Sequence, residues 1–166
     1  MSGVLELDEE GYLNLLNTII VNRLGDAVDI ELFHDEDRVK ELVAEADNYN
    51  VVVIMSNHDF EKVPAKYVIE FRLKKMAALG ADVPKLACMP HNAKDVLTLL
   101  SATNEVNGAI DNPLITMVMG DIGKVTRIAG QVFGSSLSFG AVGKTSAPGQ
   151  LSINDLRNAE NYLEMK

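Results

Sequence analysis

Apolar and polar positions follow two patterns that take turns along the chain. Short apolar runs predict β-strands, and between them lie longer segments whose apolar residues recur every three or four positions, which predicts amphipathic α-helices. The predicted strands cover residues 27–33, 51–58, 83–89, 113–119 and 135–140. The predicted helices cover residues 9–22, 35–48, 66–79, 93–106, 124–133 and 152–163. The chain therefore alternates strand and helix through about five strands.

The spacing of the strands predicts how they pair. Glu31 and His58 lie 27 positions apart, His58 and Lys85 another 27, and Lys85 and Met117 lie 32 apart. Units of this length are what a right-handed strand–helix–strand crossover requires. Strands that are apolar almost throughout need cover on both faces, so we expect a parallel sheet flanked by helices and an α/β fold.

Two sheet arrangements fit this alternation: an open doubly wound sheet and part of a barrel. Successive side chains of a strand point to opposite faces. Asp29 and Glu31 therefore share a face, as do Ser56 and His58, and Lys85 lies on the third strand. In a doubly wound sheet polar groups gather at one switch point, whereas three successive strands here each present an ionisable group near their carboxyl ends. This favours the mouth of a shortened (β/α) barrel.

Composition narrows the function. The chain has 166 residues, which fits a single domain over residues 1–166, and its formal charge of −9 argues against nucleic acid as a partner. It has a single cysteine, so we expect no disulfide framework and a cytoplasmic location. No apolar run is long enough to cross a bilayer, and the acidic start differs from a signal peptide, so we expect no membrane association.

Lys85 is the most informative single residue, because it interrupts the apolar run V-P-K-L-A-C-M-P. Apolar surroundings disfavour an ammonium and free the amine as a nucleophile, which can condense with a ketone to form a Schiff base. His58 on the neighbouring strand could then move the proton from the adjacent carbon. The alternative is structural: a lysine near a strand end often reaches solvent or pairs with an acid, and Asp29 and Glu31 are available.

Other candidate groups have ordinary explanations. Cys88 should point away from Lys85 into the core, and His34 and His91 lie in loops. The acidic run at residues 34–37 lacks the spacing of a calcium loop, and the glycines at residues 120–123 do not form a phosphate loop. We expect no metal and no cofactor.

Several motifs together resemble the type I 3-dehydroquinate dehydratase family. They occur in order from about residue 25 to the C-terminus. The motifs are I-M-S-N-H-D-F (54–60), D-V-P-K-L-A-C-M-P (82–90), L-I-T-M-V-M-G (114–120), R-I-A-G-Q-V-F-G-S (127–135) and S-A-P-G-Q (146–150). The resemblance implies a (β/α) barrel and a Schiff-base lyase that dehydrates 3-dehydroquinate to 3-dehydroshikimate in the shikimate pathway.

The resemblance also implies roles for individual residues. Lys85 would form the imine with the substrate ketone, His58 would accept and donate the proton, and Arg127 would hold the substrate carboxylate. Ser146 and Gln150 would contact the substrate from a loop that covers the site.

Three further residues complete the implied pocket. Met117 and Met119 would line it beside the reacting ring, and Asp29 would lie among the polar groups inside the barrel.

The chain departs from the family in length, since its first strand matches the fourth strand of the family's barrel. The family supplies a Glu–Arg pair, a hydroxyl-binding arginine and a histidine-orienting glutamate from the part without a counterpart here, and we expect no substitute for them. The strands around Asp29 and Phe139 should be exposed edges, which predicts a homo-oligomer. Activity should be weak or lost. The alternative is a barrel remnant without turnover that binds a small molecule or serves in an assembly.

Overall fold

The computed structural model describes residues 7–163, in which strands and helices alternate much as the apolar pattern predicts. The strands are β1 (Ala27–Glu31), β2 (Val52–Asp59), β3 (Val83–Cys88) and β4 (Ile115–Val118). The α-helices are α1 (Glu9–Val21), α2 (Glu36–Tyr49), α3 (Lys66–Ala78), α4 (Ala93–Asn107), α5 (Lys124–Ala129) and α6 (Ile153–Asn161). Two short 3₁₀ helices, η1 (Asp121–Gly123) and η2 (Gly130–Phe133), flank α5.

Side-chain caps fix where several of these helices begin. The Asp8 carboxylate accepts a hydrogen bond from the amide of Gly11 at the start of α1. Asn92 opens α4 with a complete capping box, in which Asp95 in turn accepts from the backbone of Asn92. Each cap satisfies amides that the first helical turn leaves without an internal partner.

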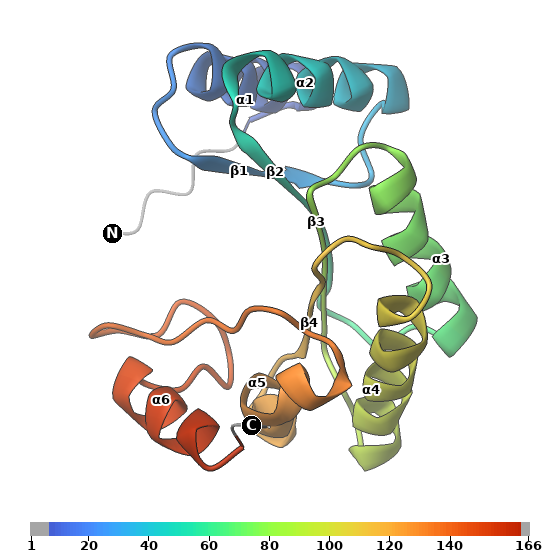
Figure 1. Cartoon of the computed structure of the whole chain (residues 1–166), viewed down its shortest axis with the longest axis vertical. Helices are drawn as coiled ribbons and strands as arrows, with labels where there is room; N and C mark the ends of the chain where they lie inside the picture. The colour runs from blue at the N-terminus through green and yellow to red at the C-terminus, as the bar shows by residue number, and fades with distance from the viewer. Residues whose placement is uncertain (1–6, 164–166) are drawn as a thin grey trace.

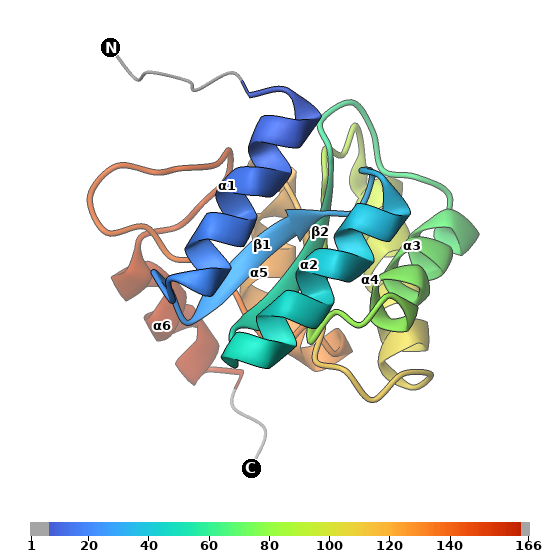
Figure 2. The same ribbon diagram turned by 90° about the horizontal axis from the view of Figure 1, so that it is seen from above.

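The sheet is parallel and its strands follow chain order, β1-β2-β3-β4. Figure 1 shows the sheet curving from β1 to β4, with α1, α2, α3 and α4 all on one side of it. Viewed from above, α1 and α2 lie next to each other over β1 and β2 (Figure 2). A doubly wound sheet would reverse its strand order and carry helices on both faces. The observed parallel sheet, with strands in chain order and these four helices on one face, is instead similar to the strand–helix arrangement of a (β/α) barrel.

The predicted fifth strand at residues 135–140 is not confirmed, and the described residues contain four strands. This segment makes one isolated bridge, from Ser135 to Leu114, and the Ser136 amide donates to the Leu114 carbonyl over 2.6 Å. The Ser135 hydroxyl then accepts from the amide of Thr116 at 3.0 Å. The Ser135 side chain thus occupies the Thr116 amide, which would otherwise donate the next hydrogen bond between two paired strands. Pairing therefore stops after one residue.

The edge of β1 is less exposed than the sequence suggested. The hydroxyl of Tyr12 in α1 accepts from the Glu31 amide at 3.1 Å and donates to the Asp29 carbonyl at 3.3 Å. The expectation of a bare edge at Asp29 is therefore wrong for these two backbone groups. Oligomerisation through the edges stays a prediction.

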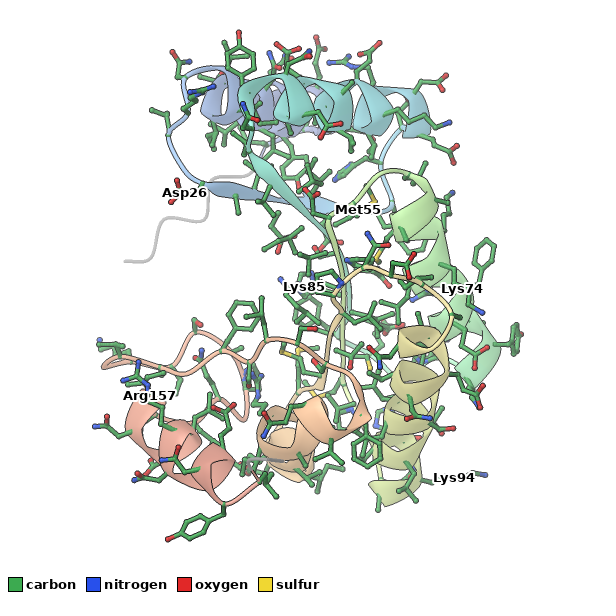
Figure 3. The ribbon with its side chains drawn as sticks, in the orientation of Figure 1. Asp26, Met55, Lys74, Lys85, Lys94 and Arg157 are labelled. Atoms are coloured by element: carbon green, nitrogen blue, oxygen red, sulfur yellow. The ribbon has the colours of Figure 1, made fainter. Side chains whose placement is uncertain are left out.

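The two faces of the sheet have different surroundings. On the helix side lies the main core, to which β3 contributes Leu86 and Cys88. On the inner side, Val83, Ala87, Ile115 and Met117 form a smaller apolar cluster. Because side chains alternate along β3, Lys85 lies on this inner face; Figure 3 shows it at the sheet, whereas Lys94 extends outward from α4.

The helix-side core predicts where a truncation is costly. Leu73 in α3 is fully buried, so Leu73→Ala should lower the free energy of unfolding by about 2–5 kcal/mol, through lost apolar contact and the cavity left behind. Leu97→Ala is the matched control: Leu97 is 65% exposed, and its loss should cost no more than about 0.5 kcal/mol. Urea denaturation of both variants measures the difference, and equal losses would contradict this core.

Candidate active site

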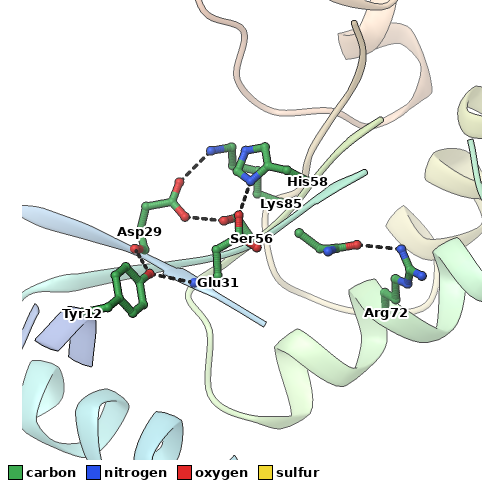
Figure 4. A network of polar contacts seen from close by, with 8 residues as sticks. Tyr12, Asp29, Glu31, Ser56, His58, Arg72 and Lys85 are labelled. Carbon is green, nitrogen blue, oxygen red and sulfur yellow. Dashed lines mark hydrogen bonds and ion pairs between the residues drawn. The ribbon is translucent and has the colours of Figure 1, made fainter. Parts of the chain in front are cut away.

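Lys85 and Asp29 form an ion pair at the centre of the inner face. The Lys85 side chain is only 13% exposed, and its Nζ donates to Asp29 Oδ2 at 2.6 Å. The other carboxylate oxygen of Asp29 accepts from the Ser56 hydroxyl. One carboxylate therefore joins β1, β2 and β3 (Figure 4), and the acid partner considered from the sequence is present.

His58 also has a carboxylate partner. Its Nδ1 contacts Glu31 Oε1, so a carboxylate acceptor favours the proton on Nδ1 and leaves Nε2 free. The ring stacks on Phe60, with 6.0 Å between the ring centroids. The expectation that this histidine lacks an orienting carboxylate is wrong. The sequence did contain a signal for this contact: Glu31 lies in the predicted strand at residues 27–33, on the same face as Asp29 and 27 positions before His58.

Arg127 supplies a second cation that has few partners. It is buried, and its Nη2 donates to the Pro148 carbonyl at 3.3 Å. Among the described residues its Nε has no hydrogen-bond partner, and no carboxylate lies within ion-pair distance. Burial lowers the pKa of this guanidinium, which nevertheless stays charged near neutral pH. A buried guanidinium with free donors is suited to a carboxylate ligand.

The loop at residues 146–150 lies over Arg127. Gln150 Oε1 accepts from both the amide and the hydroxyl of Ser146, at 2.7 and 3.1 Å. The Pro148 carbonyl accepts from the Gly120 amide at 3.2 Å as well as from Arg127. These bonds attach the loop to the carboxyl end of β4.

A pocket of about 270 Å³ joins these groups. Seven of the eight residues expected at the site line it, and the eighth, Asp29, contacts Lys85. The lining also includes apolar residues to which the sequence reasoning gave no role. The pocket is lined by His58, Phe60, Lys85, Ala87, Met117, Met119, Arg127, Phe139, Ser146, Ala147, Pro148 and Gln150. An amine, an imidazole and a guanidinium around an apolar surface suit a small carbonyl compound that carries a carboxylate.

The relationship to known proteins is unambiguous. Residues 1–166 match the family model described as type I 3-dehydroquinase. The chain belongs to the type I 3-dehydroquinase family.

Individual members of the family are similar over nearly all of this chain. The 3-dehydroquinate dehydratase of Lactiplantibacillus plantarum is 52% identical over 155 residues, which are 93% of this chain and 62% of that protein. The structure of the type I 3-dehydroquinate dehydratase from Clostridium difficile, with covalently modified comenic acid, superposes with a TM-score of 0.92 at 45% identity, over 98% of this chain and 64% of that one. The 3-dehydroquinate dehydratase of Geobacillus kaustophilus gives a TM-score of 0.93 at 35% identity, with 97% and 62% covered. The chain thus spans 62–64% of the length of these relatives.

The remaining candidate residues lie outside the pocket. Cys88 is buried on the helix side, where burial raises the pKa of its thiol to about 12, with Asp59 and Asp95 adding to the shift. His34 pairs with Glu9 at 3.0 Å. Within residues 7–163 no His, Cys, Asp or Glu cluster is arranged to hold a metal ion. In the same range no helix is long and apolar enough to cross a membrane.

The contact between the loop and β4 predicts a position-specific glycine requirement. Gly149 has a φ of +73°, and a Cβ there would lie 2.1 Å from the Gly120 carbonyl oxygen. Gly149→Ala should therefore displace the loop, break the bond from the Gly120 amide to Pro148, and speed hydrogen exchange at that amide by about tenfold or more. NMR-detected exchange measures this.

Gly143→Ala is the control, because Gly143 also has a positive φ of +84° but nothing within 4 Å of an added Cβ. If both variants speed exchange at Gly120 equally, backbone strain alone explains the result and the close approach does not matter.

Proposed function

We propose that this chain forms a Schiff base between Lys85 and 3-dehydroquinate, and that it dehydrates this substrate more slowly than its longer relatives. One observation carries the proposal: Lys85, His58 and Arg127, which come from β3, β2 and α5, line one pocket. Further support comes from the similarity to the 3-dehydroquinate dehydratase of L. plantarum, which is 52% identical.

Imine formation is the first step. Lys85 must first give up a proton, and the Asp29 carboxylate at 2.6 Å is placed to receive it. The neutral amine attacks the ketone carbon, and the resulting carbinolamine loses water to give a protonated imine. The apolar wall of Ala87, Met117 and Met119 disfavours competing hydrolysis by keeping bulk water away from this bond.

Dehydration follows at the neighbouring carbons. The protonated imine withdraws electrons and acidifies the adjacent C–H bond, whose proton passes to the free Nε2 of His58. The electron pair then forms the new carbon–carbon double bond as the hydroxyl on the next carbon leaves, and His58 returns the proton so that water departs. Hydrolysis of the imine releases 3-dehydroshikimate and regenerates Lys85. The net change is the loss of one water.

Arg127 and the loop at residues 146–150 would hold the substrate. The unpartnered Nε of Arg127 offers a donor for the substrate carboxylate. Ser146 and Gln150, already bonded to each other, offer a hydroxyl and an amide at the pocket lining. Binding the carboxylate at one end orients the ketone towards Lys85, and orientation contributes strongly to rate.

A specific observation supports slow turnover. Two other arginines lie away from the pocket: Arg23 stacks over the Tyr49 ring at 6.0 Å from its centroid, and Arg38 pairs with Glu41 at 3.2 Å. Among the described residues, Arg127 is the only arginine in the pocket lining. The substrate hydroxyls therefore lack a guanidinium partner, and losing such a group reduces the rate by about 10²–10³-fold. A binder that forms the imine without turnover is the second candidate.

Reductive trapping tests the imine. With 3-dehydroquinate and borohydride, intact mass spectrometry should show one adduct, and peptide mapping should place it on Lys85. Lys85→Ala should abolish the adduct, whereas Lys94→Ala, which removes an outward-facing lysine of α4, should leave it unchanged. Absence of an adduct in the unsubstituted protein would overturn the proposal.

A steady-state ultraviolet assay for 3-dehydroshikimate separates the two candidates. Slow product formation that is lost in Lys85→Ala supports the lyase. An adduct without product supports the binder, and turnover as fast as in the longer relatives would contradict the argument from the missing guanidinium.

A further inference from the structure

The hydroxyl of Tyr12 takes the place of a strand at the edge of β1. Leu32 donates its amide to Ser56 of β2, so the amide of Glu31, one residue earlier, points away from the sheet. Tyr12 accepts from this amide at 3.1 Å and donates to the carbonyl of Asp29 at 3.3 Å. In a parallel sheet, each bonded residue of a neighbouring strand donates to the carbonyl of one residue and accepts from the amide two positions later. The Tyr12 hydroxyl makes the same pair of hydrogen bonds.

The two residues that Tyr12 bonds carry both carboxylates of the candidate site. Asp29 contacts Ser56 and Lys85, and Glu31 contacts His58. Figure 4 shows the phenol on one side of β1 and the carboxylates of Asp29 and Glu31 reaching towards Lys85 and His58. The backbone of this short stretch therefore sets where the partners of the amine and of the imidazole lie.

Tyr12 is itself held in place. Its ring packs against His34, with 4.7 Å between centroids, and His34 in turn contacts Glu9 of α1 at 3.0 Å. Burial raises the pKa of the Tyr12 phenol, and the nearby carboxylates of Asp29 and Glu31 raise it further, although the hydrogen bond from the Glu31 backbone acts the other way. The phenol thus keeps its proton and can donate to Asp29.

We propose that Tyr12 is a positioning residue of this site. By replacing one rung of a strand ladder, its hydroxyl holds residues 29–31 so that Asp29 meets Lys85 and Glu31 meets His58. The effect on catalysis rests on the proposed function, but the effect on the Glu31–His58 contact does not. Tyr12 acts through these two carboxylates and lies outside the pocket lining.

Tyr12→Phe removes only the hydroxyl and tests the proposal. Tyr67→Phe is the control, because Tyr67 is 73% exposed on α3. In Tyr12→Phe, hydrogen exchange at the Glu31 amide should speed up by about three- to tenfold, while the Leu32 amide, which bonds into β2, should change much less. Tyr67→Phe should change neither amide.

The histidine supplies a readout that needs no substrate. Glu31→Gln removes the carboxylate that faces His58. The ring ¹⁵N resonances of His58 in this variant therefore serve as the reference for a histidine that has lost its carboxylate partner. In Tyr12→Phe these resonances should move towards the Glu31→Gln positions, and in Tyr67→Phe they should not. A merely structural role for Tyr12 would lower stability without this shift.

Reductive trapping adds the link to Lys85. At saturating 3-dehydroquinate, the rate of adduct formation in Tyr12→Phe should fall about three- to tenfold, with little change in the half-saturating concentration. The proposal is overturned if Tyr12→Phe leaves hydrogen exchange at the Glu31 amide or the His58 resonances unchanged. It is also overturned if Tyr12→Phe changes both but forms the adduct at the rate of the unsubstituted protein. If the unsubstituted protein forms no adduct while both spectral changes occur, the proposed function fails and the positioning of His58 by Tyr12 stands.

Discussion

The site depends on one carboxylate. Asp29 lies on the edge strand, yet it accepts hydrogen bonds from the Ser56 hydroxyl on β2 and from the Lys85 ammonium on β3. A largely buried lysine without such a partner would have to lose its proton or distort the strand. The ion pair lets β3 carry a polar residue between Val83 and Ala87 on an apolar inner face, and it fixes the amine at the point where the pocket begins.

The polar groups of the candidate site and the main hydrophobic core lie on opposite faces of the sheet, because α1, α2, α3 and α4 all pack on the same face (Figure 1). Helices bury one face, so side chains such as Cys88 enter a dry core and remain inert. On the inner face, Arg127 of α5, Phe139 and the loop at residues 146–150 surround a pocket, which leaves room for a ligand. Because side chains alternate along β3, Lys85 and Cys88 reach opposite environments three residues apart.

Much of this arrangement could be predicted. Apolar periodicity located the four strands, their spacing predicted the parallel pairing, and side-chain alternation placed Glu31, His58 and Lys85 on one face. The failure at residues 135–140 has a local cause: the Ser135 hydroxyl occupies the Thr116 amide, a competition between side chain and backbone that no periodicity encodes. The Glu31–His58 contact was missed because the acid was considered only as a partner of the lysine.

The sequence alone determined the alternation of strands and helices, the face on which each ionisable side chain lies, and the family to which the motifs point. These follow from local periodicity and from short stretches of residues. Only the tertiary structure decided that Asp29 pairs with Lys85, that Glu31 faces His58, and that Tyr12 bonds the edge of β1. Such contacts depend on how far neighbouring strands are offset and on where a helix packs, and both are set by the three-dimensional packing of segments distant in the chain.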